Sequence, residues 1–408
     1  MIDIILLSVR NIFRNMRRTI ITILSIIAGF TALACLGGFI EFSFEGLRES
    51  TIRSQIGHLQ IYAEGYAEKR VSNPESVVIE DAAALIEAIT ELPGVELVTP
   101  RLSFSGLGSA GNDVVNMSVI GVDLAKERIF SSFETAVAGR RLRPRDIDGG
   151  VVGEQLFKGL GADVGDWVTI LTNSADGVLN AVDFKIIGVV RTGSIEYDSV
   201  FVKIPIERAQ QVRETKGVER LIVLLHETHT MDAIRPQIET LLTDLGFAYE
   251  ILQWTDLASF YNAVEQLYTG LFRVFSGIIW IVVMFAIANT MVMSVFERTN
   301  EIGILRAIGM TRTRLITMFL LEGIWIGLLG STLGVTASWG ISYGLDLIGG
   351  FSMPPPPGNT QGFQAFLIIT PQTYVIAFVV VFCATLLSSL YPASMASRVK
   401  IVEALHSQ

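Results

Sequence analysis

The sequence predicts an α-helical membrane protein with four transmembrane helices and a large α+β domain inserted between the first helix and the second. The chain has 408 residues, of which 50% are hydrophobic and only 17% charged, and this balance is too apolar for a soluble domain of that length. The apolar residues are also concentrated in four runs, and a long mixed interval separates the first run from the second. These two observations define the fold class.

Each apolar run is long enough to cross a membrane, which takes roughly 20 residues of helix. The predicted spans are 19–44, 274–296, 315–348 and 374–390, and the last of these only just reaches that length. We therefore expect three regions, which are a basic N-terminal segment with the first span (1–45), the inserted domain (46–265) and a region with the other three spans (266–408).

The positions of lysine and arginine predict the orientation, because cytoplasmic loops of membrane proteins are enriched in both. The loop 349–370 contains neither residue. The flanking basic residues are Arg10, Arg14, Arg17 and Arg18 before the first span, Arg298, Arg306, Arg312 and Arg314 between the second and third, and Arg398 and Lys400 after the fourth. Both termini and the loop 297–314 are therefore expected in the cytoplasm, and the inserted domain outside.

The inserted domain alternates strand-like and helical patterns, as an α+β fold does. Ser174 to Gly177 is expected to form a hairpin tip, because Asp176 and Gly177 suit a tight turn. Thr255 is expected to cap a helix of about 40 residues that continues into the second span. The expected strands are 58–62, 114–122, 167–171, 184–190, 199–204 and 220–225, the expected helices are 81–92, 206–215 and 231–245, and 123–216 is expected to form an inserted subdomain.

A short charged helix is predicted at 301–310, between the second and third spans. Apolar Ile302, Leu305 and Ile308 recur at helical spacing, so the segment can lie on a membrane surface and present a polar face to a soluble partner. Glu301 and Arg306 supply that polar face, and Met310 ends the segment. A solvated basic loop that only sets the topology is an equally good interpretation of the pattern.

Polar residues inside the apolar runs are candidate functional or packing positions, because an unpaired charge in the membrane is costly. In the third span, Glu322 is expected either to lie at the membrane interface or to pair with an arginine near the cytoplasmic surface. Four glycines of that span have the spacing of close helix packing, either within the chain or across a dimer: Gly323, Gly327, Gly330 and Gly334. The candidate substrate contacts in the first two spans are Glu41, Phe44, Phe275 and Asn289.

The sequence gives no sign of catalysis, of a metal site or of a bound cofactor. The glycine cluster 159–165 is followed by Asp166 where a phosphate-binding loop needs lysine, so we expect ATP to be bound by a partner and not by this chain. The four histidines lack metal-ligand spacing. A formal net charge of −9 gives no support to a nucleic-acid partner.

Several motifs resemble one transporter family. The run 297–309 (ERTNEIGILRAIG) resembles the signature of the FtsX-type permease module of MacB-like ABC transporters, and 391–398 (YPASMASR) with 403–405 (EAL) resembles its C-terminal ending. The run 151–154 (VVGE) with the glycines that follow is similar to the MacB-type periplasmic core. The run 56–61 (IGHLQI) resembles the lipoprotein-releasing LolC and LolE permeases.

The resemblance implies a permease of the bacterial inner membrane that works by mechanotransmission. Two permease subunits, either two copies or two paralogues, would bind a separate cytosolic ABC ATPase through the coupling helix at 301–310. In Lol-type relatives the cargo is a lipoprotein that passes to a periplasmic carrier. Efflux of a peptide or small amphiphile, as in MacB, and activation of a cell-wall hydrolase without transport are the alternatives.

Overall fold

The computed structural model describes residues 8, 10, 14, 16–69, 77–111, 113–174, 177–354 and 363–398. Contacts divide the chain into two units. The helical unit comprises Met1–Glu45, Val264–Met353 and Gln364–Gln408, and the sheet unit comprises Gly46–Ala263 and Pro354–Phe363. Each unit has its own buried core, so each is described separately below.

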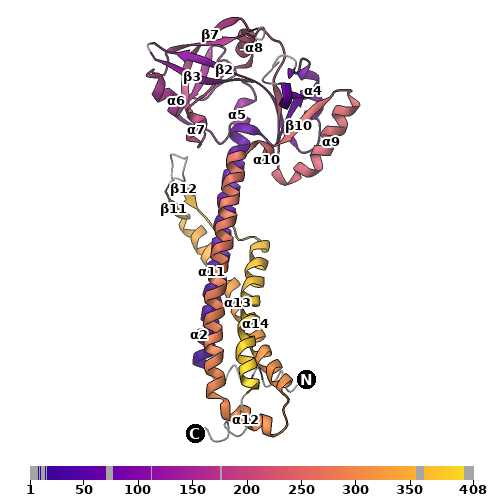
Figure 1. Cartoon of the computed structure of the whole chain (residues 1–408). Helices are drawn as coiled ribbons and strands as arrows, with labels where there is room; N and C mark the ends of the chain where they lie inside the picture. Colours follow the sequence, from indigo (N-terminus) through magenta and orange to yellow (C-terminus); the bar gives the residue numbers. More distant parts are fainter. Residues whose placement is uncertain are drawn as a thin grey trace. The chain divides into compact units, whose positions relative to one another are not determined.

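The helical unit contains the predicted spans. Within the described residues, four helices are long and apolar enough to cross a membrane, as the sequence predicts. They are α2 (Met16–Thr51), α11 (Ser259–Glu297), α13 (Arg312–Ile348) and α14 (Pro371–Ser397). The short α12 (Thr299–Ala307) joins α11 to α13, and the short strands β11 (Phe351–Met353) and β12 (Phe363–Ala365) pair between α13 and α14 (Figure 1).

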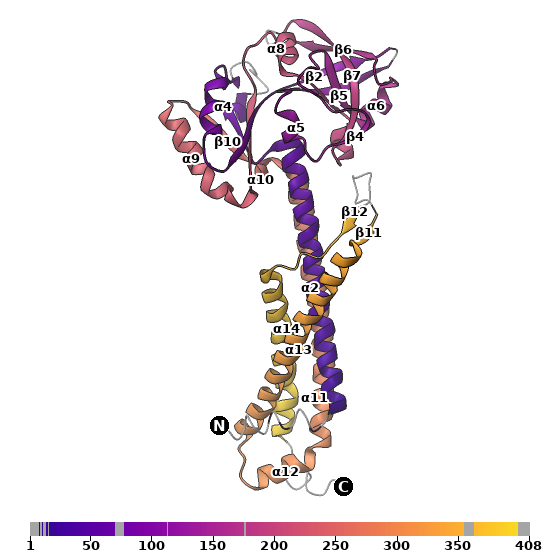
Figure 2. The same ribbon diagram turned by 180° about the vertical axis from the view of Figure 1, so that it is seen from behind.

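Glycines of α13 bring the helices of this unit into close contact. A Cβ added to Gly330 would lie 2.5 Å from Ile26 of α2, and one added to Gly334 would lie 2.7 Å from Phe30. Gly323 and Gly327 face α14 in the same way, at 3.0 Å from Ser389 and 3.1 Å from Thr385. The predicted close packing is therefore confirmed, and it occurs within the chain. Figure 2 shows α13 and α14 running side by side.

The sheet unit is built on one large sheet. Among the described residues it has ten strands in the order β10-β1-β9-β2-β3-β8-β5-β7-β4, and β6 pairs with β2 and β7. Two pairings, β3 with β8 and β5 with β7, are parallel, and the others are antiparallel. The strands are β1 (Leu59–Ala63), β2 (Val95–Ser109), β3 (Val114–Val122), β4 (Thr135–Gly139), β5 (Gly149–Gly153), β6 (Trp167–Asn173), β7 (Leu179–Arg191), β8 (Phe201–Pro205), β9 (Arg220–Leu225) and β10 (Tyr249–Gln253).

Helices and short turns pack on this sheet around a core of valine, leucine and isoleucine. In both views α4 and α9 lie side by side next to β10 (Figures 1 and 2). The helices are α3 (Tyr66–Lys69), α4 (Ala82–Thr90), α5 (Glu127–Phe130), α6 (Glu154–Leu160), α7 (Ile195–Asp198), α8 (Ile206–Arg213), α9 (Met231–Asp244) and α10 (Trp254–Leu257), with a π-helical turn at Ile52–Ile56 and a 3-10 turn at Thr228–Thr230.

The structure corrects several expectations for this unit. Thr255 is not a helix cap, because Gln253 caps the short α10 with Asp256, and the long α11 starts only after a break at Ala258. The strands of the segment 123–216 continue the same sheet, but Leu142, Val151, Val190 and Phe201 of this segment also belong to a second, smaller core cluster, so the expected subdomain stays a prediction. Strands β2, β4, β5 and β10 were not predicted. The hairpin between β6 and β7 is confirmed, although Asp176 lies outside the described residues.

The glycine cluster after α6 has a structural explanation. Helix α6 ends at Leu160, and Gly161 follows it with φ 60° in the left-handed region, where glycine avoids the steric cost of a side chain. Gly165 also has a positive φ, 111°, at the turn into β6. These glycines therefore serve two turns of the backbone.

A cluster of four charges is buried in the sheet unit. Lys203 of β8 donates to Glu127 at 2.7 Å and to Glu134, and Arg101 of β2 donates to Glu127 at 2.5 Å. All four side chains are at most 5% exposed. Burial alone would lower the pKa of Lys203, but the two carboxylates outweigh it and the pKa is raised. The ammonium is therefore held in its charged form.

His58 lies where the π-helical turn at the end of α2 meets β1. Its Nδ1 accepts from the backbone N–H of Leu225 at 3.0 Å, so the ring proton is on Nε2, which lies 2.9 Å from the hydroxyl of Thr228. That hydroxyl donates to Glu49 at 2.8 Å. Burial lowers the pKa of His58 to about 4; the charge of Glu49 opposes this and that of Arg53 adds to it. The imidazole is therefore neutral at neutral pH.

Candidate functional site

Helix α12 lies across the ends of α11 and α13 (Figure 1). Glu301 in its first turn and Arg306 in its last turn match the partial charges at the two helix ends. The helix ends at Ala307 because Gly309 takes φ 102°, and the N–H groups of Gly309 and Met310 bond back to the carbonyls of Arg306 and Leu305. Compared with the predicted segment 301–310, the helix starts two residues earlier and ends three residues earlier.

Ion pairs surround the start of α12. Arg14 pairs with Glu301, and Arg18 of α2 pairs with Glu297 at the end of α11. These pairs are partly exposed, and each contributes little to stability. The N-terminal arginines, used above only to predict the orientation, thus pair with acidic residues at the end of α11 and in the first turn of α12.

A buried ion pair joins the same junction to α13. Arg298, the residue between α11 and α12, lies 3.6 Å from Glu322, and each side chain is 6% exposed. The expected pairing of Glu322 with an arginine is confirmed. A buried pair of this kind costs free energy to assemble, but removing one partner strands the other charge. The pair therefore fixes the junction relative to α13.

The apolar residues of α12 have two different environments. Ile302 is 2% exposed and packs with Leu315 and Phe319. Ile304 and Ile308, four positions apart on one side of the segment, are 45% and 80% exposed. The predicted common face of Ile302, Leu305 and Ile308 is therefore divided, because Ile302 is part of the bundle core. The exposed apolar side chains are those of Ile304 in α12 and of Ile308, the C-cap residue that follows the helix, and we call these two residues the outer face of α12.

The other predicted coupling residues lie near this face. Leu305 and Arg306 are half-buried, and Met310 packs on the same core cluster as Ile302. Ile304 was not predicted as a contact residue, because the expected apolar stripe ran through Ile302. An amphipathic stripe cannot be aligned from spacing alone when neighbouring isoleucines occur at 302, 304 and 308.

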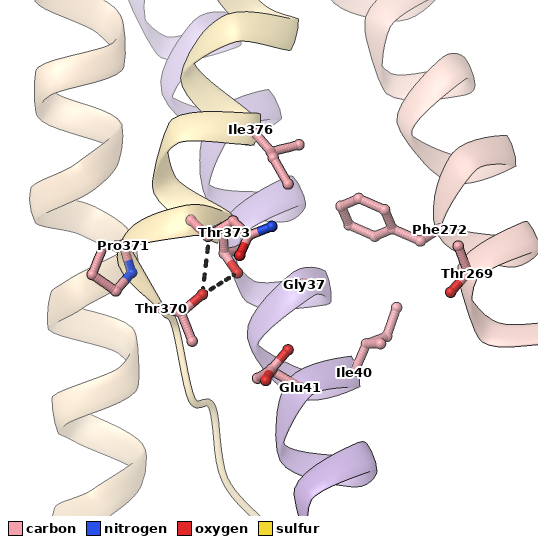
Figure 3. A pocket seen from close by; sticks show the side chains of 10 residues that line it. Gly37, Ile40, Glu41, Thr269, Phe272, Thr370, Pro371, Thr373 and Ile376 are labelled. Atoms are coloured by element: carbon pink, nitrogen blue, oxygen red, sulfur yellow. Dashed lines mark hydrogen bonds between the residues drawn. The ribbon is translucent and has the colours of Figure 1, made fainter. Parts of the chain in front are cut away.

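A pocket of about 500 Å³ opens between α2, α11 and α14 of the helical unit. Figure 3 shows Phe272 of α11 pointing toward α14, with Ile40 and Glu41 on α2. Helix α14 starts at this pocket, where the hydroxyl of Thr370 accepts from the N–H of Thr373 at 3.3 Å. The complete lining is Gly37, Ile40, Glu41, Thr269, Phe272, Thr370, Pro371, Gln372, Thr373 and Ile376.

The candidate substrate contacts are only partly brought together. Glu41 lines the pocket, whereas Phe44 packs edge-on against Tyr268 of α11, with ring centroids 5.9 Å apart. Phe275 is 47% exposed, Asn289 is exposed, and neither lines the pocket. The pocket residues of α14 were missed, although threonine before proline at 370–371 is a helix-start signal that the sequence contains.

Comparison with known proteins defines the class. A family model described as the MacB-like periplasmic core domain matches residues 19–241, more than half of the chain. A second, described as FtsX-like permease C-terminal, matches residues 273–401. Together with the four apolar helices and the inserted α+β domain, these matches define a multi-span membrane protein. The chain belongs to the family that carries a MacB-like periplasmic core domain followed by an FtsX-like permease segment.

Three relatives illustrate the range of this family. The chain is 30% identical to the ABC transporter permease YtrF of Bacillus subtilis, over 55% of this chain and 52% of that protein. It is 24% identical to the macrolide export ATP-binding/permease protein MacB of Bdellovibrio bacteriovorus, over 77% and 48%. It is 25% identical to the lipoprotein-releasing system transmembrane protein LolC of Neisseria meningitidis, over 95% and 93%. The chain thus matches about half the length of the first two and nearly all of the third.

Proposed function

We propose that this chain is the membrane subunit of an ABC transporter of the bacterial inner membrane, and that it moves a lipoprotein or another lipid-anchored cargo. A separate cytosolic ATPase binds the outer face of α12. Its ATP-driven movement passes along α11 and α2, whose residues continue into the sheet unit. The observation that supports the proposal is the surface of α12. The buried ion pair between Arg298 and Glu322 fixes the start of this helix, while the apolar side chains of Ile304 and Ile308 are exposed.

Two isoleucines exposed beside arginines are typical of a protein contact, because apolar anchors with a charged rim are the usual composition of an interface. The basic residues of this rim are Arg306 and Arg314. The proposed orientation, with both termini and α12 in the cytoplasm, places this face where a soluble ATPase is available.

The lipid-anchored cargo is favoured by the match to LolC, which extends over nearly the full length of both chains. The expected complex then contains a second permease, as a copy or a paralogue, and releases its cargo to a periplasmic carrier. Efflux of a peptide or small amphiphile is the second candidate, and the match to MacB over 77% of this chain supports it.

The test compares substitutions on and beside α12 in the full-length chain, purified with whatever ATPase it retains from its native membrane. Ile308→Glu places a charge in the proposed contact, and we expect the retained ATP hydrolysis to fall at least about tenfold, since a buried unpaired charge costs several kcal/mol. Reversing the charge with Arg306→Glu should uncouple the hydrolysis that remains from cargo release.

Arg312→Glu is the matched control, because Arg312 is exposed but begins α13 and lies outside α12. It should retain the hydrolysis of the unmodified chain. Normal coupled release by Ile308→Glu and Arg306→Glu would refute the assignment of α12. Mass spectrometry of a complex trapped with a non-hydrolysable nucleotide distinguishes the cargoes: an acylated protein supports the first candidate and a small amphiphile the second.

A further inference from the structure

Glu41 is the charged side chain that lines the pocket between α2, α11 and α14. It is half-buried, and among the residues that the structure describes it has no hydrogen-bonding or ion-pairing partner. A carboxylate that is partly removed from water without a partner is unfavourable. Its position therefore favours a ligand that brings the missing donor.

The other acidic residues of the helical unit differ from Glu41. Glu297, Glu301 and Glu322 each lie beside an arginine. The acidic residues without such a partner, Glu45, Glu265 and Asp346, are exposed to solvent. Within the described part of this unit, Glu41 is thus the acidic residue that is half-buried and yet has no cation beside it.

The polar neighbours of Glu41 are occupied with each other. The hydroxyl of Thr370 lies 3.0 Å from that of Thr373 and also accepts from the backbone N–H of Thr373 (Figure 3). These contacts complete the cap of α14. The two threonine hydroxyls are therefore engaged with each other and with the backbone of α14, and not with Glu41.

The rest of the pocket is apolar. Ile40, Phe272 and Ile376 come from three different helices and line its other side. A volume of about 500 Å³ is in the range of small-ligand sites, which commonly combine apolar walls with a few polar groups. A ligand that satisfies both sides has an apolar chain and a cationic head.

We propose that this pocket binds an amphiphile through a protonated amine, with the ammonium group on Glu41 and the apolar chain against Phe272 and Ile376. The inference rests on the proposed function in giving this pocket a role in cargo contact. It names the ligand chemistry that the pocket selects, which two sources share: the ethanolamine head of a phospholipid and the amine of a free amphiphile.

The test measures the binding of radiolabelled dodecylamine and of dodecanol to the purified full-length chain in nanodiscs of phosphatidylglycerol. We expect the amine to bind more tightly than the alcohol. Glu41→Gln should weaken binding of the amine about tenfold, the usual effect of losing a charge-assisted hydrogen bond, and leave the alcohol unchanged. Glu45→Gln, on the same helix but exposed, is the matched control and should change neither.

Equal affinity for amine and alcohol, or equal effects of the two substitutions, would overturn the proposal. An unchanged thermal midpoint of Glu41→Gln shows that the variant is folded. Adding phosphatidylethanolamine identifies the source of the ligand. If this lipid displaces dodecylamine, the ligand is the lipid head group. If it does not displace dodecylamine, and binding of the amine still depends on Glu41, the ligand is a free amphiphile. Because the assay contains no ATPase, its failure leaves the proposed coupling through α12 standing, and a failure of that coupling does not affect the binding result.

Discussion

His58 and Lys203 are ionisable side chains that the fold encloses almost completely. They are buried for different reasons. His58 is neutral and connects a backbone amide to a hydroxyl, whereas Lys203 is charged and lies between two carboxylates. Neither environment could be predicted from the sequence, because the partners of both residues come from distant segments, such as Thr228 for His58 and Glu127 for Lys203. Their contributions to stability should therefore depend differently on pH.

For His58 we expect stability to fall as the pH drops from about 6.5 to 4. In this window the unfolded chain binds a proton at His58 that the folded chain, with its pKa near 4, does not, so the folded state loses up to about 3 kcal/mol. His58→Asn keeps an acceptor for Leu225 but cannot titrate. Denaturant unfolding of both chains across this window should give a stability difference that shrinks on acidification. If the free energy of unfolding of the two chains changes equally with pH, His58 is not the source of the pH dependence.

For Lys203 we expect a large loss of stability at neutral pH when the ammonium is removed. Lys203→Met leaves the buried Glu127 paired only with Arg101 and removes the salt bridge of the buried Glu134, which costs on the order of 3–5 kcal/mol. Lys158→Met is the control, because Lys158 pairs with Glu154 on the surface and should change stability by less than about 0.5 kcal/mol. Thermal unfolding that ranks the two variants equally would contradict a structural role of the buried cluster.

At the scale of the elements, the long periodic segments could be predicted and the irregular ones could not. The four spans were found because each carries a long apolar run, and β3 and β9 because they are short apolar strands. Strand β2 was missed since Pro100 and several serines and glycines interrupt its pattern. It tolerates Pro100 because its pairing with β3 starts only at Arg101. For α12 the helical spacing of the apolar residues was predicted correctly, but the exposed residues are Ile304 and Ile308 and not the predicted set of Ile302, Leu305 and Ile308.

The glycines of α13 provide a prediction at this scale. Gly334→Ala puts a Cβ 2.7 Å from the ring of Phe30, and we expect a loss of about 1–3 kcal/mol from overpacking. Gly340→Ala is the control on the same helix, with no atom within 4 Å of the new Cβ, and should be neutral or stabilising by up to about 1 kcal/mol. Thermal midpoints in detergent measure both. A neutral Gly334→Ala would mean that α13 and α2 are not packed closely.

At the scale of the whole molecule, the family and the layout could be predicted because they depend on motifs and apolar runs that are local in sequence. The run at 297–309 indicated an FtsX-type permease; it lies inside the FtsX-like match to residues 273–401, and the MacB-like match to residues 19–241 precedes it. The pocket could not be predicted, since its lining comes from three helices that are far apart in the chain.

The central claim is that a separate nucleotide-hydrolysing protein binds the outer face of α12 on the cytoplasmic side. The most direct measurement is photo-crosslinking in native membranes from a benzophenone attached at Ile308, whose side chain is 80% exposed, with the buried Ile302 as the control position. We predict that Ile308 crosslinks to an ATP-hydrolysing protein that is reached only from the cytoplasmic face, and that Ile302 does not. The account would be contradicted if Ile308 crosslinked only to lipid, or if that position were labelled by a reagent added on the side of the membrane away from the cytoplasm.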